Sequence, residues 1–420
     1  MIDVNVYKLP NGLTLLHHYD CSTRMVCVNL LYDVGSRDEN QSCTGLAHLM
    51  EHLMFTGSRY APDFDGALQA AGGESNAWTS ADMTNYYETL PAQNLETALW
   101  LESGRLLGLN LNDQGVSVQK KVVVEEFKQR CLNQPYGDLS HCVNSVAYTV
   151  HPYRWPVIGL SPDDIERASH REIVDFFHSH YAVNNLILCI SGHVALDRAV
   201  DLVVKWFGDI EPVQLPKREL PQEPAHTARR CAHFRRDVPD DMVYLVFNMC
   251  GRTERDYVAC DQLSDILSNG TSSRLYQNVL LKTGMFTDLD ASVTGTIDPG
   301  LFLLRGRLSK GVKFDRALAA IEQELQRLVD DGVTQYEHEK ATNKYESNFL
   351  FENIGYAEKA VKLCQYELLG KNSLELDYNA DSLNTEVGRY HNLDRSRLQQ
   401  VASQLFRPEN SSVIFYGPNA

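Results

Sequence analysis

Residues 211–225 divide the 420-residue chain into halves of similar size. This segment holds four prolines among charged and amide residues, a composition typical of an extended linker. In each half, a strand-like apolar run is followed by a polar loop and an amphipathic helix, as in residues 25–39 and 242–256. The repeat length is about 200 residues. We therefore expect an α+β fold of two homologous domains, residues 1–210 and 226–420, each with a mixed, mostly antiparallel sheet and helices packed on one face.

Charge and hydropathy exclude several classes of partner. The 55 acidic and 39 basic residues give a net charge of −16, which disfavours nucleic acid and anionic membranes. No apolar run approaches the length of a transmembrane helix. The N-terminus lacks a basic region followed by an apolar run, and the ten cysteines are scattered singly. We therefore expect a cytoplasmic protein with reduced thiols and without a signal or transit peptide.

The segment Gly45–Phe55, Gly-Leu-Ala-His-Leu-Met-Glu-His-Leu-Met-Phe, carries the strongest chemical signal. Its apolar residues recur at helical spacing, which predicts an amphipathic helix. His48 and His52, four positions apart, lie on one face of such a helix and can share one metal ion. Glu51 lies beside that face, where its carboxylate can accept a proton from water. This order, His-x-x-Glu-His, inverts the commoner zinc-peptidase motif, and it predicts a zinc site with Glu51 as the base.

The alternative is a chance match on a core helix. A random match in a chain with 14 histidines has a probability on the order of one in a hundred. A core helix also has little reason to bury three polar side chains, because buried polar groups need partners. The pattern therefore favours metal, and Ser42 and Thr44 are candidates for the N-terminal cap of the helix.

A two-histidine site needs a further ligand, and Glu125 and Glu126 are the candidates in a later predicted helix. Adjacent helix positions point about 100° apart, so only one of them can reach the ion. Val122, Val123 and Phe127 form the apolar face, and Glu126 shares it more squarely than Glu125. Glu126 is therefore preferred. Without the histidine pair, two solvated carboxylates on a surface helix would be the default interpretation.

Taken together, these motifs resemble those of the pitrilysin/insulinase-type zinc peptidases, the group that includes mitochondrial processing peptidase. The resemblance is strongest over residues 8–160. Besides the helix it rests on residues 9–13, 35–39, 72–86, 101–105, 121–126 and 151–159. It implies hydrolysis of peptides, with one Zn²⁺ per chain held by His48, His52 and Glu126, and with Glu51 as the general base.

The resemblance also implies how substrate binds. Glu74–Thr79 would be a sheet-edge strand whose backbone near Asn76 and Ala77 pairs with an extended peptide. The alternative for Asn76 is an amide that caps its own turn. Gln119 stands where the family often has a Glu seven residues before the metal-binding one. An amide can still hydrogen-bond a metal ligand, so we expect tuning of the metal site and not its loss.

The second half departs from the family. Active members commonly carry an Arg and a Tyr, seven apart, that stabilise the oxyanion, but the matching positions here are Leu280 and Thr287. Family chains of this length work as pairs that enclose a chamber. The resemblance therefore implies the catalytic subunit of a heterodimer whose partner supplies Arg and Tyr, or else a homodimer with a weakened oxyanion site. The rival is a non-catalytic structural or binding subunit of the same fold, which the intact motif disfavours.

Overall fold

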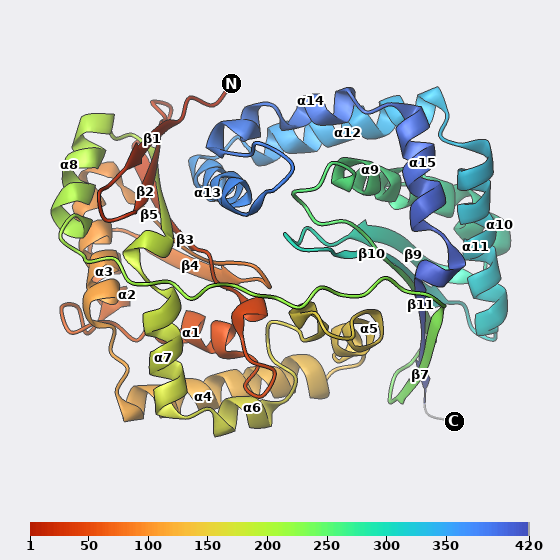
Figure 1. Ribbon diagram of the computed structural model, residues 1–420, viewed down its shortest axis with the longest axis horizontal. Helices are drawn as coiled ribbons and strands as arrows, with labels where there is room; N and C mark the ends of the chain where they lie inside the picture. The colour runs from red at the N-terminus through yellow and green to blue at the C-terminus, as the bar shows by residue number, and fades with distance from the viewer. Residues whose placement is uncertain (419–420) are drawn as a thin grey trace.

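The computed structural model describes residues 1–418 and contains one β-sheet in each half of the chain (Figure 1). The first sheet contains, in spatial order, β1 (Asn5–Lys8), β2 (Thr14–Tyr19), β6 (Leu186–Gly192), β3 (Met25–Tyr32), β5 (Thr84–Pro91) and β4 (Glu74–Thr79). The second contains β7 (Arg230–Arg236), β11 (Ser411–Pro418), β8 (Met242–Asn248), β10 (Leu301–Leu308) and β9 (Phe286–Val293).

The two sheets repeat one topology. Apart from β1, the spatial order of the second sheet matches that of the first strand for strand, with β7 in the place of β2 and β11 in the place of β6. The pairs β2–β6 and β7–β11 are parallel, and the other paired strands of residues 1–418 are antiparallel. The expected fold of two mixed, mostly antiparallel α+β units is confirmed.

Helices from each half cover one face of that half's own sheet (Figure 1). On the first sheet these are α1 (Leu46–Met54), α2 (Phe64–Ala70), α3 (Leu95–Gly108), α4 (Asp113–Phe127), α6 (Pro162–Arg167), α7 (His170–His180) and α8 (Leu196–Phe207). On the second they include α9 (Tyr257–Ser268), α11 (Phe314–Asp331), α12 (Gln335–Glu352) and α15 (Arg395–Leu405).

The opposite face of each sheet is covered by a helix from the other half. α13 (Tyr356–Asn372) packs on β3 and β6 of the first sheet, and α5 (Leu139–Ala147) packs on β7, β8 and β11 of the second. This exchange explains why β6 is buried along its whole length, because a strand covered on both faces reads as a continuous apolar run. The two halves are therefore interlocked.

The segment that joins the halves is extended, as its prolines indicate, but it is anchored. Residues 210–226 form neither helix nor strand and cross the molecule between α8 and β7 (Figure 1). The Glu223 side chain accepts hydrogen bonds from the backbone N–H groups of residues 149, 150 and 151, at 2.8, 2.9 and 3.1 Å. Arg218 Nε donates to Asp38 Oδ1 at 2.7 Å. The segment is therefore held against the first half.

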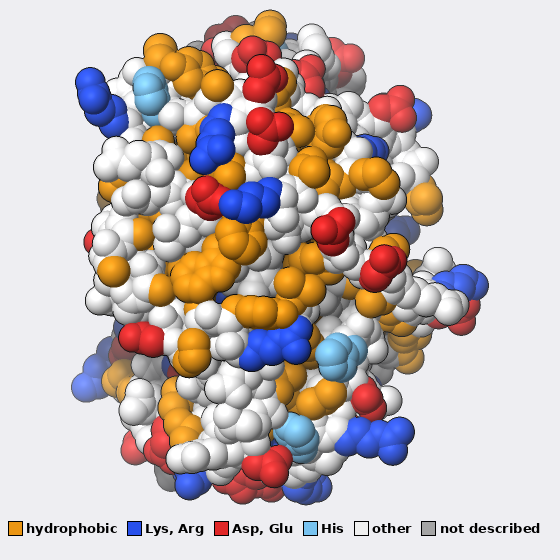
Figure 2. Space-filling view, turned by 90° about the vertical axis from the view of Figure 1, so that its left-hand side faces the viewer, with side chains coloured by type: hydrophobic (Ala, Val, Ile, Leu, Met, Phe, Trp, Pro, Cys, Tyr) orange, Lys and Arg blue, Asp and Glu red, His pale blue; other side chains and the backbone are white. Residues whose placement is uncertain are grey.

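Figure 2 shows the outer side of the first half, with hydrophobic side chains gathered near the middle of the face. Acidic and basic side chains are interspersed over the rest of this face. Within residues 1–418, every helix is too short or too polar to cross a bilayer.

Candidate metal centre

Helix α1 is preceded by a glycine, and its N-terminus is capped by a side chain from the loop before it. Gly45 adopts a left-handed backbone conformation, with φ of 87°. The side chain of Glu39 accepts hydrogen bonds from the N–H groups of Gly45 and Ala47 at 2.9 and 2.8 Å, which satisfies donors that a helix N-terminus leaves unpaired. Burial raises the pKa of Glu39 to about 8, although these two donors lower it. The expectation of Ser42 or Thr44 as the cap is wrong, since the Thr44 hydroxyl donates to Asp164 instead.

The apolar side chains of α1 face the core, which leaves its polar side chains beside α4. Leu49 and Leu53 are fully buried against the first sheet. The side chains of His48 and His52 are 10% and 24% exposed, and that of Glu126 on α4 is 19% exposed. The three groups thus lie at the boundary between core and solvent, where a bound ion can be reached.

His48, His52 and Glu126 converge on one point. The Oε2 atom of Glu126 lies 3.7 Å from His48 Nε2 and 3.2 Å from His52 Nε2. Their ligand atoms all lie within 4.8 Å of one another, and residues 1–418 hold no other group of three His, Cys, Asp or Glu side chains that meets this condition. Burial, and then the neighbouring His52, lower the pKa of His48 to about 4, so its imidazole is neutral and keeps a lone pair for a metal.

The spacing fits a zinc ion. Ligand atoms at the usual zinc bond length, in tetrahedral directions, lie about 3.4 Å apart. The two measured separations, 3.2 and 3.7 Å, lie on either side of that value. Two imidazoles and one carboxylate are also the donor set of catalytic zinc sites with one open position. The residues present therefore fit zinc.

The neighbours of Glu126 explain why it faces the histidines and Glu125 does not. Glu125 is exposed and pairs with Lys128 at 2.6 Å. The other oxygen of Glu126, Oε1, pairs with Arg130 at 2.9 Å, which leaves Oε2 directed at the histidines. The predicted inward face of α4 was partly wrong: Val122 is exposed, whereas Val123, Val124 and Phe127 are buried.

Glu51 faces the same site from α1 and is held by a second element. The Thr79 hydroxyl, on β4, donates a short hydrogen bond to Glu51 Oε2. Burial raises the pKa of Glu51, and the bond from Thr79 opposes this rise. The carboxylate is therefore both oriented and made more basic, which suits an acceptor of a proton near neutral pH.

β4 is an edge strand of the first sheet, as expected for Glu74–Thr79. Among residues 1–418, β5 is the one strand paired with it, so its other edge is open to an added strand. Within β4 the N–H of Ala77 donates to the side-chain oxygen of Asn76 at 2.8 Å. Asn76 thus satisfies its neighbour's backbone donor within a strand and not within a turn.

The remaining predicted residues lie as follows. Gln119 is half-buried on α4, and its side chain makes no hydrogen bond among residues 1–418, so its proposed bond to a metal ligand is not formed here. Leu280 packs against the core of the second half. Thr287 is exposed on β9, and its hydroxyl donates to the carbonyl of Arg307 at 3.4 Å. Neither position carries an Arg or Tyr side chain.

Sequence reasoning missed three groups around the site: Thr79, Glu39 and Arg130. Arg130 follows Glu126 by four residues, a spacing that signals a pair on one helix face. Thr79 lies within a family motif, but its contact with Glu51 joins residues 28 positions apart and has no local signal. No local pattern identifies Glu39, because it caps the helix across a loop.

Comparison with known proteins shows which protein family the chain resembles. The family model described as "Insulinase (Peptidase family M16)" matches residues 15–158, and the model described as "Peptidase M16 inactive domain" matches residues 167–345. A zinc protease of Helicobacter pylori, PqqE, is 29% identical over 98% of this chain and 92% of its own length. An uncharacterized zinc protease of Rickettsia bellii is 26% identical over 99% of this chain and 98% of its own length.

Solved structures agree with this assignment. The crystal structure of a protease from Helicobacter pylori superposes with a TM-score of 0.90 at 28% identity, covering 100% of both chains. A peptidase M16 inactive domain from Pseudomonas fluorescens shares the fold, with a TM-score of 0.85 at 16% identity over 100% of this chain and 99% of that one. With its two domain models matched in order and its relatives named as zinc proteases, this chain belongs to the insulinase family, peptidase family M16.

Proposed function

We propose that this protein is a zinc-dependent endopeptidase that hydrolyses peptides, with His48, His52 and Glu126 as ligands of one Zn²⁺. The observation that carries the proposal is the convergence of these three side chains on one point beside Glu51. A non-catalytic subunit has no need to hold two histidines and an oriented carboxylate of α1 beside the carboxylate of Glu126 on α4.

Side chains of this protein would transfer the protons and orient the catalytic base. Zinc bound here would polarise the scissile carbonyl and make the attacking water more acidic. Glu51 accepts the proton of that water and delivers it to the leaving amine. The hydrogen bond from Thr79 fixes the carboxylate for both transfers. Because Thr79 ends β4, the strand that would align the substrate also holds the base.

Substrate would bind by strand addition at the free edge of β4. An extended peptide there gains backbone hydrogen bonds that do not depend on its sequence. Ala77 can donate to the peptide once the side chain of Asn76 turns away, so Asn76 would act as a placeholder for substrate. Such pairing holds the scissile bond in one orientation, which favours attack. It also restricts substrates to unfolded or short peptides.

The second half supports a paired assembly. Leu280 cannot donate a hydrogen bond and Thr287 is too short to replace a phenol, so this half lacks the expected oxyanion donors. We propose that a second two-domain chain supplies them in a heterodimer, with a homodimer as the simpler arrangement.

The test replaces Glu51 by Gln. Glu51→Gln should keep the zinc content of the parent and lose peptide cleavage by about 10²–10⁴-fold, the usual contribution of a general base. Glu125→Gln is the matched control, because Glu125 is exposed and faces away from the site. Cleavage by Glu51→Gln at the parent's rate would reject the assigned base. Zinc binding without any cleavage by the parent, alone or paired, would favour the non-catalytic subunit.

A further inference from the structure

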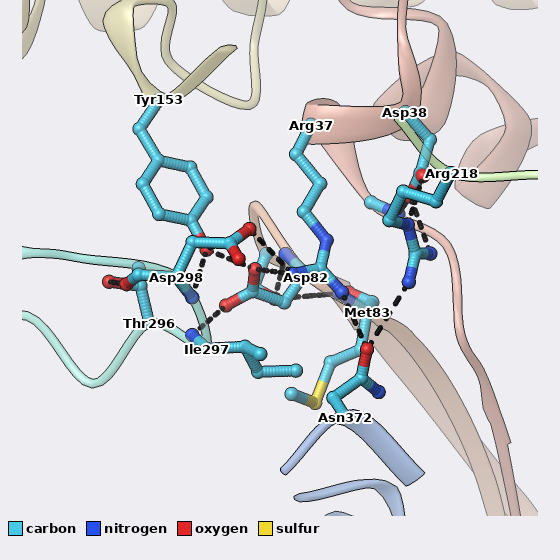
Figure 3. Close-up of polar contacts among 12 residues, drawn as sticks. Arg37, Asp38, Asp82, Met83, Tyr153, Arg218, Thr296, Ile297, Asp298 and Asn372 are labelled. Carbon is cyan, nitrogen blue, oxygen red and sulfur yellow. Dashed lines mark hydrogen bonds and ion pairs between the residues drawn. The ribbon is translucent and has the colours of Figure 1, made fainter. Parts of the chain in front are cut away.

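Three segments that the proposed chemistry does not use meet one turn of the second half. They are the loop at residues 35–39, the β4–β5 turn at residues 80–83 and the segment at residues 151–153 (Figure 3). All three contact the β9–β10 turn at residues 294–300. We call Arg37, Asp82, Tyr153 and Asp298 the interdomain cluster.

Arg37 is the centre of the interdomain cluster (Figure 3). Its side chain is 1% exposed, and its Nη1 atom lies 2.9 Å from Asp298 Oδ2 and 3.1 Å from Asp82 Oδ1. Burial by itself would lower the pKa of Arg37, but the surrounding carboxylates, Asp82 first, raise it well above its usual value. A buried cation thus joins one carboxylate from each half of the chain.

The contact is reinforced by backbone groups, which fixes the turn in place. Asp82 Oδ2 accepts the backbone N–H of Ile297 at 2.9 Å. The Tyr153 hydroxyl donates to Asp82 and accepts the N–H of Asp298 at 3.1 Å. Ile297 is itself buried in the core cluster that contains Met83. These directional bonds leave the β9–β10 turn little freedom to slide against the first half.

The first-half residues of the interdomain cluster adjoin both parts of the proposed active site. Arg37 lies two residues before Glu39, which caps the N-terminus of α1. Asp82 lies three residues after Thr79, which bonds Glu51. The loop and the turn also contact directly, because the N–H of Arg37 donates to the carbonyl of Ala81 at 2.9 Å. A side chain at Gly35 would overlap the same carbonyl, so only glycine permits this approach.

Two further contacts join the loop to the linker and to α13. Arg218 Nη1 lies 2.9 Å from Asp33 Oδ1, and its Nε donates to Asp38. The amide oxygen of Asn372 accepts from Arg218 at 3.4 Å and from Arg37 at 3.5 Å (Figure 3). Residues distant in sequence therefore hold the loop that ends in Glu39. Through Glu39, the same loop caps the N-terminus of α1.

We propose that the interdomain cluster lets the second half set the positions of α1 and β4, so that Arg37 and Asp298 are positioning residues for the peptidase site. The half without the metal motif would then do more than enclose the site, because it would also hold catalytic elements of the first half in position. Its β9–β10 turn holds both the helix that carries His48, Glu51 and His52 and the strand that orients Glu51. The consequence for turnover rests on the proposed function, whereas the consequence for local structure does not.

The direct test is hydrogen–deuterium exchange of the metal-free protein. Asp298→Asn removes the second half's charge with little change in size, and Tyr153→Phe removes one hydroxyl if the first variant does not fold. We expect faster exchange, by about tenfold or more, in residues 36–54 and 74–83, because the cap of α1 and the end of β4 lose their support. The matched control is Asp288→Asn on the same hairpin, where Asp288 is exposed and its one ion pair within residues 1–418 is with Arg305, at 3.4 Å.

The second readout is turnover of the zinc-loaded protein. Asp298→Asn should lower kcat about tenfold or more at near-parental zinc content, since small displacements of positioned groups are costly in rate. Exchange that rises only in residues 294–300, with kcat unchanged, would overturn the proposal and reduce the cluster to an interdomain contact. If the parent itself does not cleave peptides, the proposed function fails, and the exchange measurement still decides whether the second half positions α1 and β4.

Discussion

Replacement of Arg105 by Met should destabilise the first half strongly, because Arg105 is the only cation in a buried cluster beneath α1. Arg105 is 1% exposed, and its guanidinium lies 3.0 Å from Glu102 and 3.8 Å from the ring centre of Phe64. It also lies 5.0 Å from the ring centre of Phe55, which directly follows α1. Burial, and then the neighbouring Glu102, raise the pKa of Glu88 well above its usual range, which favours the neutral form of its carboxyl group. The ion pair of this cluster is therefore the one between Arg105 and Glu102.

The magnitude follows from what the substitution leaves behind. Glu102 is 0% exposed, and the loss of Arg105 would leave its carboxylate buried without an ion-pair partner. Breaking a buried pair in this way costs about 3–5 kcal/mol. Met keeps most of the volume of the Arg stem, so a cavity adds little. Replacing Glu102 by Gln in the same protein removes the stranded charge, and the double variant should recover most of the lost free energy of unfolding.

The assay is urea unfolding of the metal-free protein followed by tryptophan fluorescence. Trp78, Trp100, Trp155 and Trp206 are the four tryptophans of the chain, and all lie in the first half, so the signal reports on that half. A loss below about 1 kcal/mol, or a double variant no more stable than the single one, would refute the reasoning.

Two further substitutions test the groups that surround α1. Thr79→Val keeps the side-chain shape but removes the hydrogen bond to Glu51. At unchanged zinc content, kcat should therefore fall about tenfold or more. An unchanged kcat would show that Glu51 needs no orienting donor. Glu39→Gln tests pH dependence. Burial raises the folded-state pKa of Glu39 to about 8, above the ordinary glutamate value of 4.5, so the stabilisation from this group is complete below pH 4.5 and is lost as pH rises towards 8. The free energy of unfolding of the parent should fall over that window by up to about 1.4 kcal/mol per pH unit relative to Glu39→Gln, measured by urea titrations, and parallel profiles would contradict the raised pKa.

Local periodicity predicted the parts of the site that depend on helix geometry. The four-residue spacing placed His48 and His52 on one face of α1, where the structure has them. The same reasoning favoured Glu126 over Glu125, and the structure directs Glu126 at both histidines. It misplaced Val122, because the buried stripe of α4 runs through Val123, Val124 and Phe127, and a run of valines does not show which one faces solvent.

Contacts between distant segments could not be read from the sequence. Arg37 and Asp298 are 261 positions apart, and no local pattern connects an arginine in one loop with an aspartate in another. The exchange of α5 and α13 between the sheets is hidden for the same reason, since each is amphipathic without indicating which sheet it covers. The cap of α1 by Glu39 depends on how the loop folds back, which residue preferences for helix caps do not capture.

Zinc affinity measured by competition with a chelator tests the central claim most directly. The parent should bind one Zn²⁺ per chain, Glu126→Gln should bind it at least about 100-fold more weakly, and Glu125→Gln should bind it as the parent does. The loss is expected because Glu126 contributes the only carboxylate among the three converging ligands. If Glu126→Gln holds zinc as tightly as the parent, or if the parent binds none, the three side chains do not form a zinc site and the account is contradicted.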